Sequence, residues 1–178
     1  MRRCLDRWVI AGLVLVWLLG LGSPAVRAGG PASEPNFPES ELAIIVNTAN
    51  PVESLSLSEL RKVFLGERSH WPSGRRITLV MMEPGQPERK ALIHEVCQMN
   101  EGDFSKHFLQ GVFTGEVFVS PKTLASPVGV RKFIFNVPGA IGYVRASEVD
   151  SSVKVIRVDG HLPSDREYGL HLQPRAAQ

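Results

Sequence analysis

The 178-residue sequence has little cysteine, few aromatic residues and no excess of charge of one sign. Its two cysteines, Cys4 and Cys97, are too few for a disulfide-stapled scaffold. The 20 Lys and Arg nearly balance the 18 Asp and Glu, and 43% of the residues are hydrophobic, which excludes global disorder. Residues 1–28 hold four arginines and one acid, so the remainder has a net charge of −1. This balance argues against a nucleic-acid partner.

No apolar run is long enough to cross a bilayer comfortably. Met1–Arg7 is basic, and Trp8–Leu21 is an uncharged run of 14 residues, whereas a membrane-spanning helix needs roughly 20. Val26 and Ala28, small or medium residues at positions −3 and −1 of a cut after Ala28, follow a Gly-Ser-Pro break. This pattern predicts a signal peptide over residues 1–28, cleaved after Ala28, and a periplasmic protein. The alternative is an uncleaved leader, which would be the only contact with a membrane.

The rest of the chain divides into three parts. Residues 29–40 are rich in proline and predict a disordered leader, residues 41–160 predict the folded domain, and residues 161–178 predict a polar tail. Apolar runs predict buried strands at 42–46, 77–82, 139–144 and 153–158. Helices are expected after Ser56, Pro87, Asp103 and Ser126. Alternating strands and helices predict the α/β fold class.

Several single residues carry local predictions. Ser56 and Glu59 form a capping-box pattern at the start of one helix, and Gly66 is placed to end that helix. Gly142, within the apolar run 139–144, is expected to leave room for a neighbouring element. Trp71 is expected to pack beside a turn.

The loop after residues 77–82 is the candidate ligand site. Gly85 lies just before the helix that starts at Pro87, where backbone amides and the helix dipole favour an anion. We expect Gly85 and Gln86 to offer amides, Arg89 a guanidinium group, and Asn47 an amide from a neighbouring strand end. Glu88 lies beside them in the sequence and should weaken anion binding. The alternative is a solvated turn with exposed Arg89 and Lys90.

The sequence lacks a set of residues for catalysis or metal binding. His94 and Cys97 are three residues apart, but a zinc site needs three or four ligands and no second motif is present. Cys97 is therefore interpreted as a small core residue. We expect no catalytic residue, no metal, no cofactor and no enzymatic activity.

Four segments together resemble one known family. They are Ile45–Asn47 with Asn50-Pro51, the stretch Leu55–Gly66, Trp71 with Ser73-Gly74, and Pro138–Val144. Their order and spacing resemble the phosphate-binding protein of ABC transporters, within the type 2 periplasmic binding protein superfamily. The match runs from about Ala43 to Val158. It implies a single lobe of that fold with a central, mostly parallel sheet flanked by helices. It also implies a phosphate-like anion as ligand, and a transporter permease or a second lobe or subunit as partner.

Two departures from that family affect the function. Its members have two lobes, and this chain has about half their length. Their phosphate loop reads Ser-Gly-Thr, where this sequence has Gly85-Gln86-Pro87-Glu88, so two hydroxyls and one amide donor are missing. Two hypotheses remain: a periplasmic solute-binding protein for phosphate or another small oxyanion, and a non-catalytic interaction or accessory module of an envelope system.

Overall fold

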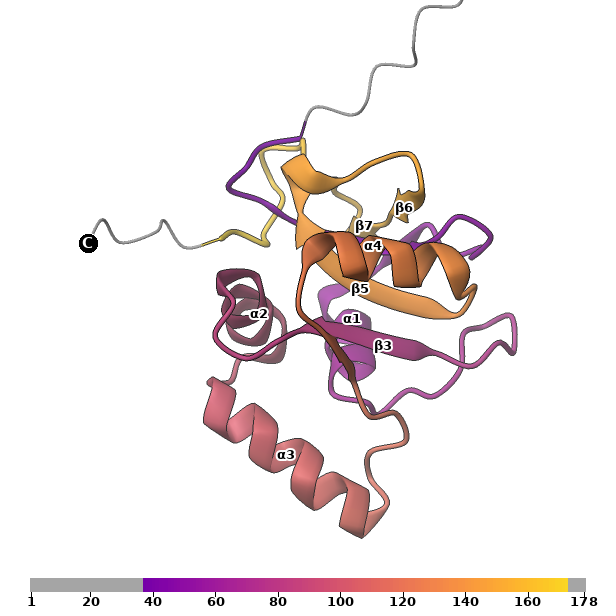
Figure 1. Cartoon of the computed structure of the whole chain (residues 1–178), viewed down its shortest axis with the longest axis vertical. Helices are drawn as coiled ribbons and strands as arrows, with labels where there is room; N and C mark the ends of the chain where they lie inside the picture. Colours follow the sequence, from indigo (N-terminus) through magenta and orange to yellow (C-terminus); the bar gives the residue numbers. More distant parts are fainter. Residues whose placement is uncertain (1–36, 173–178) are drawn as a thin grey trace, which may run out of the picture. The chain divides into compact units, whose positions relative to one another are not determined.

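The computed structural model describes residues 37–172, and the predicted signal peptide lies outside this range. The strands are β1 (Leu42–Asn47), β2 (Ser54–Leu55), β3 (Thr78–Met82), β4 (Lys122–Leu124), β5 (Ala140–Arg145), β6 (Val153–Val155) and β7 (Arg157–Val158). The helices are α1 (Leu57–Phe64), α2 (Pro87–Leu92), α3 (Glu101–Thr114) and α4 (Pro127–Asn136), with a π-helix η1 (Ile93–Cys97) and a short 3-10 helix η2 (Ala146–Glu148). The predicted α/β class is confirmed (Figure 1).

One five-stranded sheet organises the domain, in the order β4-β3-β5-β1-β6. Strand β3 pairs in parallel with both β4 and β5, whereas β1 is antiparallel to β5 and β6. Four strands therefore run in one direction and only β1 runs against them. The sheet is mixed, and its two antiparallel pairs both involve β1. The short strands β2 and β7 form a separate parallel pair that the sequence did not predict.

Helices cover both faces of this sheet (Figure 1). Successive side chains of a strand point to opposite faces, and neighbours in β5 show this clearly. A Cβ on Gly142 would lie 3.0 Å from Cδ1 of Ile134 in α4, so this glycine lets α4 approach the sheet as predicted. The ring of Tyr143 faces the other side, where Phe64 of α1 lies 6.0 Å away between ring centroids. The core therefore has two layers, one on each side of β5.

The local signals around α1 and Trp71 are confirmed. Ser56 and Glu59 make both hydrogen bonds of the capping box, and Gly66 has a φ of 75° just after the helix. Trp71 is buried, and its indole Nε1 donates to the carbonyl oxygen of Gly139 at 3.0 Å. This bond joins two of the segments that carry the family resemblance.

The core extends further along the chain than predicted. Tyr168, Leu170 and Leu172 are buried, and the Tyr168 hydroxyl donates to the carbonyl of Leu42 at 2.6 Å. The expected end of the folded domain at Gly160 is therefore wrong, because residues 161–172 pack beside β1. Phe37, in the expected leader, also packs against the core.

The segment from α2 to α3 departs from the predicted helix pattern. Helix α2 continues directly into η1, and Gln98 then adopts a left-handed conformation with a φ of 56°. Helix α3 is capped by Asn100, whose side chain accepts from the amide of Asp103 at 2.9 Å. Asp103 was expected to be the cap, so this helix starts earlier than predicted. Among residues 37–172, no helix combines the length and apolar character needed to span a membrane.

Candidate functional site

The loop between β3 and α2 presents an open backbone. Gly85 is exposed with a φ of 92°, and a Cβ at this position would meet no atom within 4 Å. Gln86 is the N-cap residue of α2 but makes no side-chain capping bond, and Pro87 in the first turn has no N–H. The loop therefore has room for a ligand and offers fewer donors than a complete phosphate loop.

The guanidinium group of Arg89 is directed into the protein. Its side chain is only 7% exposed, and its Nε donates to Oε1 of Glu101 at 2.6 Å. Nη1 donates to the carbonyl of Met82 at 2.9 Å, and the guanidinium carbon lies 5.4 Å from the ring centre of Phe104. Two nitrogens of the guanidinium group predicted to bind an anion are thus already engaged within the chain.

Glu88 is buried and forms a second ion pair, at the edge of the sheet where β3 and β5 end. Its side chain is 7% exposed, and its Oε1 accepts from Nε of Arg145 at 2.5 Å. Arg145 ends β5, beside the end of the parallel strand β3. Sequence reasoning placed Glu88 beside the site but missed its partner, since 57 residues separate the two in the chain.

Charges of both signs meet at this edge. Three carboxylates, Glu88, Glu101 and Glu148, lie near the guanidinium groups of Arg89 and Arg145, and Arg131 also acts on Glu148. Burial raises the pKa of Glu148, and the nearby charge of Glu88 raises it further. An anion entering here would have to compete with carboxylates that already hold both arginines.

Asn47 lies at the opposite end of the sheet from the Gly85 loop. Val46, Ile141 and Leu79 form one row across β1, β5 and β3, so Asn47 follows this row near the start of β3. The Gly85 loop lies beyond the other end of β3, more than about 10 Å away at 3.3 Å per residue. The expected meeting of Asn47 with this loop is wrong, because β1 runs antiparallel to β5.

Asn47 instead caps the C-terminus of helix α4. Its Nδ2 donates to the carbonyls of Ile134 and Phe135 at 2.8 and 2.6 Å. Its Oδ1 accepts from the amide of Ala49 at 2.8 Å. These bonds use the whole side-chain amide in joining α4 to the end of β1, which is a structural role.

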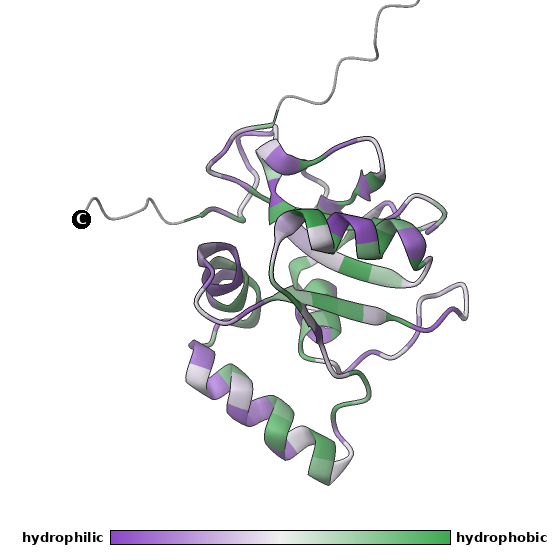
Figure 2. Ribbon diagram, viewed as in Figure 1, coloured by the Kyte–Doolittle hydropathy of each residue, from purple (hydrophilic) through white to green (hydrophobic). Residues whose placement is uncertain are grey.

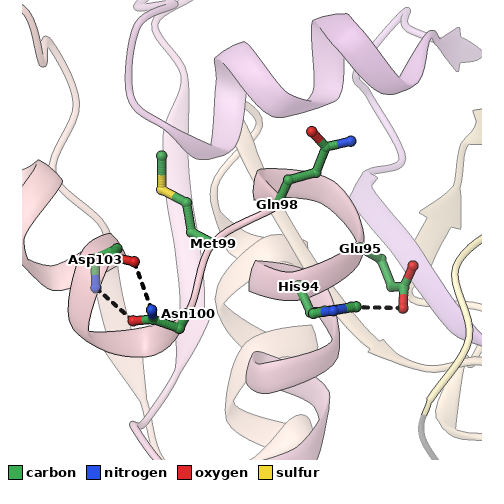
Figure 3. A pocket seen from close by; sticks show the side chains of 6 residues that line it. All are labelled: His94, Glu95, Gln98, Met99, Asn100 and Asp103. Atoms are coloured by element: carbon green, nitrogen blue, oxygen red, sulfur yellow. Dashed lines mark hydrogen bonds and ion pairs between the residues drawn. The ribbon is translucent and has the colours of Figure 1, made fainter.

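A pocket of about 520 Å³ lies between η1 and the start of α3 (Figure 3). Its lining residues are His94, Glu95, Gln98, Met99, Asn100 and Asp103. His94 bonds to Glu95, and Asn100 and Asp103 bond to each other in capping α3. The polar side chains thus serve local structure and form no nucleophile with an oriented base.

Cys97 is a core residue, as predicted. It is fully buried, and burial raises its pKa to about 12, so its thiol stays protonated. His94, three residues earlier, is exposed. Over residues 37–172, no cluster of three His, Cys, Asp or Glu side chains could hold a metal ion.

No family model matches the sequence, but individual proteins do. The phosphate-binding protein PstS of Bacillus subtilis (strain 168) is 30% identical over 127 residues, which cover 68% of this chain and 37% of that protein. The chain therefore spans little more than a third of the curated relative that it matches. That relative is named as a binding protein, which agrees with the prediction that this chain is not an enzyme.

Solved structures of the same class share the fold. An ABC-type phosphate transport receptor from Vibrio cholerae matches with a TM-score of 0.58 and 21% identity, over 70% of this chain and 48% of the receptor. PstS from Borrelia burgdorferi matches with a TM-score of 0.58 and 14% identity, over 78% of this chain and 57% of that protein.

These matches define the class of protein. The fold is an α/β unit that corresponds to about half of a phosphate transport receptor. The sequence resemblance is confirmed, and the chain is homologous to part of a phosphate-binding protein of the ABC-transporter class.

Proposed function

We propose that this protein is an exported, non-catalytic interaction or accessory module of an envelope system, built on half of a phosphate-binding protein. The observation that carries the proposal is the buried ion pair between Glu88 and Arg145. The family resemblance implies a phosphate site at the loop before α2. Beside this loop the carboxylate of Glu88 is already paired with Arg145. A free phosphate at Arg145 would have to displace that carboxylate from within one half of a cleft.

The second ion pair supports the same function. Arg89 gives its Nε to Glu101 and its Nη1 to a main-chain carbonyl, while its side chain is almost fully buried. Breaking such a pair without replacement leaves a poorly solvated charge, which is costly. Both arginines therefore hold α2 and α3 against the sheet.

A second candidate function is favoured by the 30% identity with a protein named as phosphate-binding. In this case the chain binds phosphate or another small oxyanion at Gly85, Gln86 and Arg89 after a second lobe or subunit completes the cleft. It would then deliver the anion to an ABC transporter permease. Under this proposal Arg89 exchanges Glu101 for the ligand.

Isothermal titration of the exported protein with inorganic phosphate distinguishes the two functions. The module predicts no saturable heat at millimolar phosphate, for the wild type and for Arg89→Ala alike. Glu88→Gln tests the role of the Glu88–Arg145 pair, because a neutral amide leaves the Arg145 guanidinium group free to bind an anion. If only the Glu88→Gln variant binds phosphate, the module is supported, because the Glu88 carboxylate then excludes the anion from Arg145 in the wild type.

The opposite result would replace the proposal. If the wild type binds phosphate saturably, and Arg89→Ala weakens binding by about 1.5–3 kcal/mol, the chain is a solute-binding protein. N-terminal sequencing of the exported protein tests its location separately, since a chain that begins at Gly29 establishes cleavage after Ala28. An intact Met1 in the membrane fraction would indicate a retained leader.

A further inference from the structure

The loop that enters β3 is a short hairpin rich in arginine. The amide of Trp71 donates to the carbonyl of Arg75 at 2.8 Å. The amide of Ile77 donates to the carbonyl of Ser69, also at 2.8 Å. Residues 68–77, termed the basic hairpin, are largely purple and white beside the green strand β3 in Figure 2. The backbone bonds give this polar segment a defined shape although most of it is exposed.

Trp71 fixes the basic hairpin to the sheet. Its side chain is buried, and its indole Nε1 donates to the carbonyl of Gly139 at 3.0 Å. At the tip, Gly74 has a φ of 79°, and a Cβ there would meet no atom within 4 Å. A partner that contacts the tip therefore meets a surface that is open and already ordered, which reduces the entropic cost of binding.

The basic side chains of the hairpin lie close together. His70 and Arg76 are direct partners across its two arms, and both are exposed. They form a non-hydrogen-bonded pair, the type in which opposite side chains lie closest. Nε of Arg68 donates to the carbonyl of His70 at 3.2 Å, which holds a second arginine at the same place. The His70 ring is oriented by a 2.9 Å bond between its Nδ1 and the Ser69 hydroxyl, so Nε2 is left for a ligand.

Few carboxylates balance this charge. Among residues 37–172, no acid forms an ion pair with Arg75 or Arg76. Arg68 has only a distant pair, 3.8 Å from Glu59, and such an exposed pair stabilises little. Glu67 is the one acid within residues 67–76, whereas the rest of the chain after residue 28 is net negative. Positive charge is therefore concentrated at this hairpin.

We propose that the basic hairpin is the docking surface for an acidic, carboxylate-rich segment of a partner protein. Guanidinium groups present paired N–H donors that match carboxylates. A single small anion would stay largely in water here, because Arg75 and Arg76 are exposed and each exposed pair contributes little. A segment with several carboxylates engages all the basic side chains of the hairpin at once.

The hairpin lacks what a lipid surface would require. None of the large hydrophobic side chains that are exposed in residues 37–172 belongs to residues 68–77. Peripheral binding to a bilayer normally combines basic groups with apolar side chains that enter the acyl boundary. The basic hairpin offers charge alone, which favours an acidic protein segment.

The hairpin and the Gly85 loop lie at opposite ends of β3, so this docking surface is separate from the Glu88–Arg145 pair. The docking surface deepens the proposed function and rests on it, because it gives the chemistry of the partner. The two fail in different experiments. Titration with inorganic phosphate tests the function, and titration with an acidic peptide tests the surface.

Fluorescence anisotropy of a labelled oligoglutamate peptide, titrated with the exported protein, tests the surface. The wild type should bind saturably at low ionic strength, and added salt should weaken binding because it screens exposed charges. An oligoglutamine peptide of the same length should not bind. Absence of oligoglutamate binding, or equal binding of the two peptides, would overturn the proposal.

Paired substitutions locate the binding surface. Arg75→Gln/Arg76→Gln should weaken oligoglutamate binding about tenfold, because two of the exposed charges are lost. Lys106→Gln/Lys132→Gln is the matched control, since both lysines are exposed on other elements and the change in net charge is the same. Thermal melts establish that both double variants are folded. Equal weakening by the two would mean attraction by net charge alone and would overturn the hairpin as the surface.

Vesicles of phosphatidylglycerol test the other class of anionic partner. The wild type should not sediment with them at the ionic strength at which it binds oligoglutamate. Sedimentation that is lost in Arg75→Gln/Arg76→Gln would assign the hairpin to a membrane surface and overturn the protein partner.

Discussion

The two ends of β5 are held by different kinds of interaction. At its start, Gly139 accepts a hydrogen bond from buried Trp71, and no charged group takes part in this contact. At its end, Arg145 holds buried Glu88, beside the pair between Arg89 and Glu101. The start carries the segments that resemble the phosphate-binding proteins. The loop beside the end, Gly85 to Glu88, departs from them, and two internal ion pairs lie there.

The largest loss of stability should come from a substitution at the start of β5, where Trp71 is buried. Trp71→Ala removes a buried indole and its bond to Gly139, and should lower the free energy of unfolding by about 3–5 kcal/mol. Trp71→Phe keeps most of the volume and should cost less. Urea unfolding followed by circular dichroism measures both. Equal losses for the two variants would mean that the hydrogen bond, and not the packing, dominates.

The charged end is tested by Arg145→Met. The substitution leaves the Glu88 carboxylate buried without its partner, and should cost about 3 kcal/mol of stability. The double variant Arg145→Met/Glu88→Gln removes the stranded charge and should recover much of the loss. A double-mutant cycle from urea midpoints gives the coupling energy. Additive losses would show that the two side chains do not stabilise each other.

Gly142 tests how closely the middle of β5 approaches α4. A Cβ here would already lie 3.1 Å from the carbonyl oxygen of Val80. Gly142→Val should therefore destabilise the protein by about 1–3 kcal/mol through overpacking. Gly169→Ala is the control, because no atom lies within 4 Å of its added Cβ. Unchanged thermal stability of Gly142→Val would argue against this packing.

The smallest effect concerns Glu148, the third carboxylate near the end of β5. Burial and the charge of Glu88 raise the pKa of Glu148, so its ionised form is disfavoured in the folded state. Glu148→Gln should then raise stability slightly at neutral pH, by about 0.5 kcal/mol or less. The wild type should regain this difference as the pH falls through the raised pKa, because protonation removes the penalty. Thermal melts across this pH range follow the difference, and a gain that is constant with pH would exclude the titration.

Local patterns in the sequence were enough for most elements of the fold. The capping box at Ser56, the turn at Gly66 and the apolar run of β5 each depend on neighbours within a few residues. The interpretation of Cys97 as a core residue followed from the absence of further ligands for a metal in the sequence. Strand β2 was missed, because two residues carry no periodic signal, and the strand predicted over 153–158 divides into β6 and β7.

The sequence by itself determined the α/β class, the main buried strands and the relation to phosphate-binding proteins, since each follows from local periodicity or from matching segments. Only the tertiary structure decided which of the candidate site residues lie together. The reversed direction of β1 takes Asn47 away from the Gly85 loop, and strand direction is set by long-range pairing. The Glu88–Arg145 pair joins residues that are 57 positions apart, because the ends of β3 and β5 meet at one edge of the sheet.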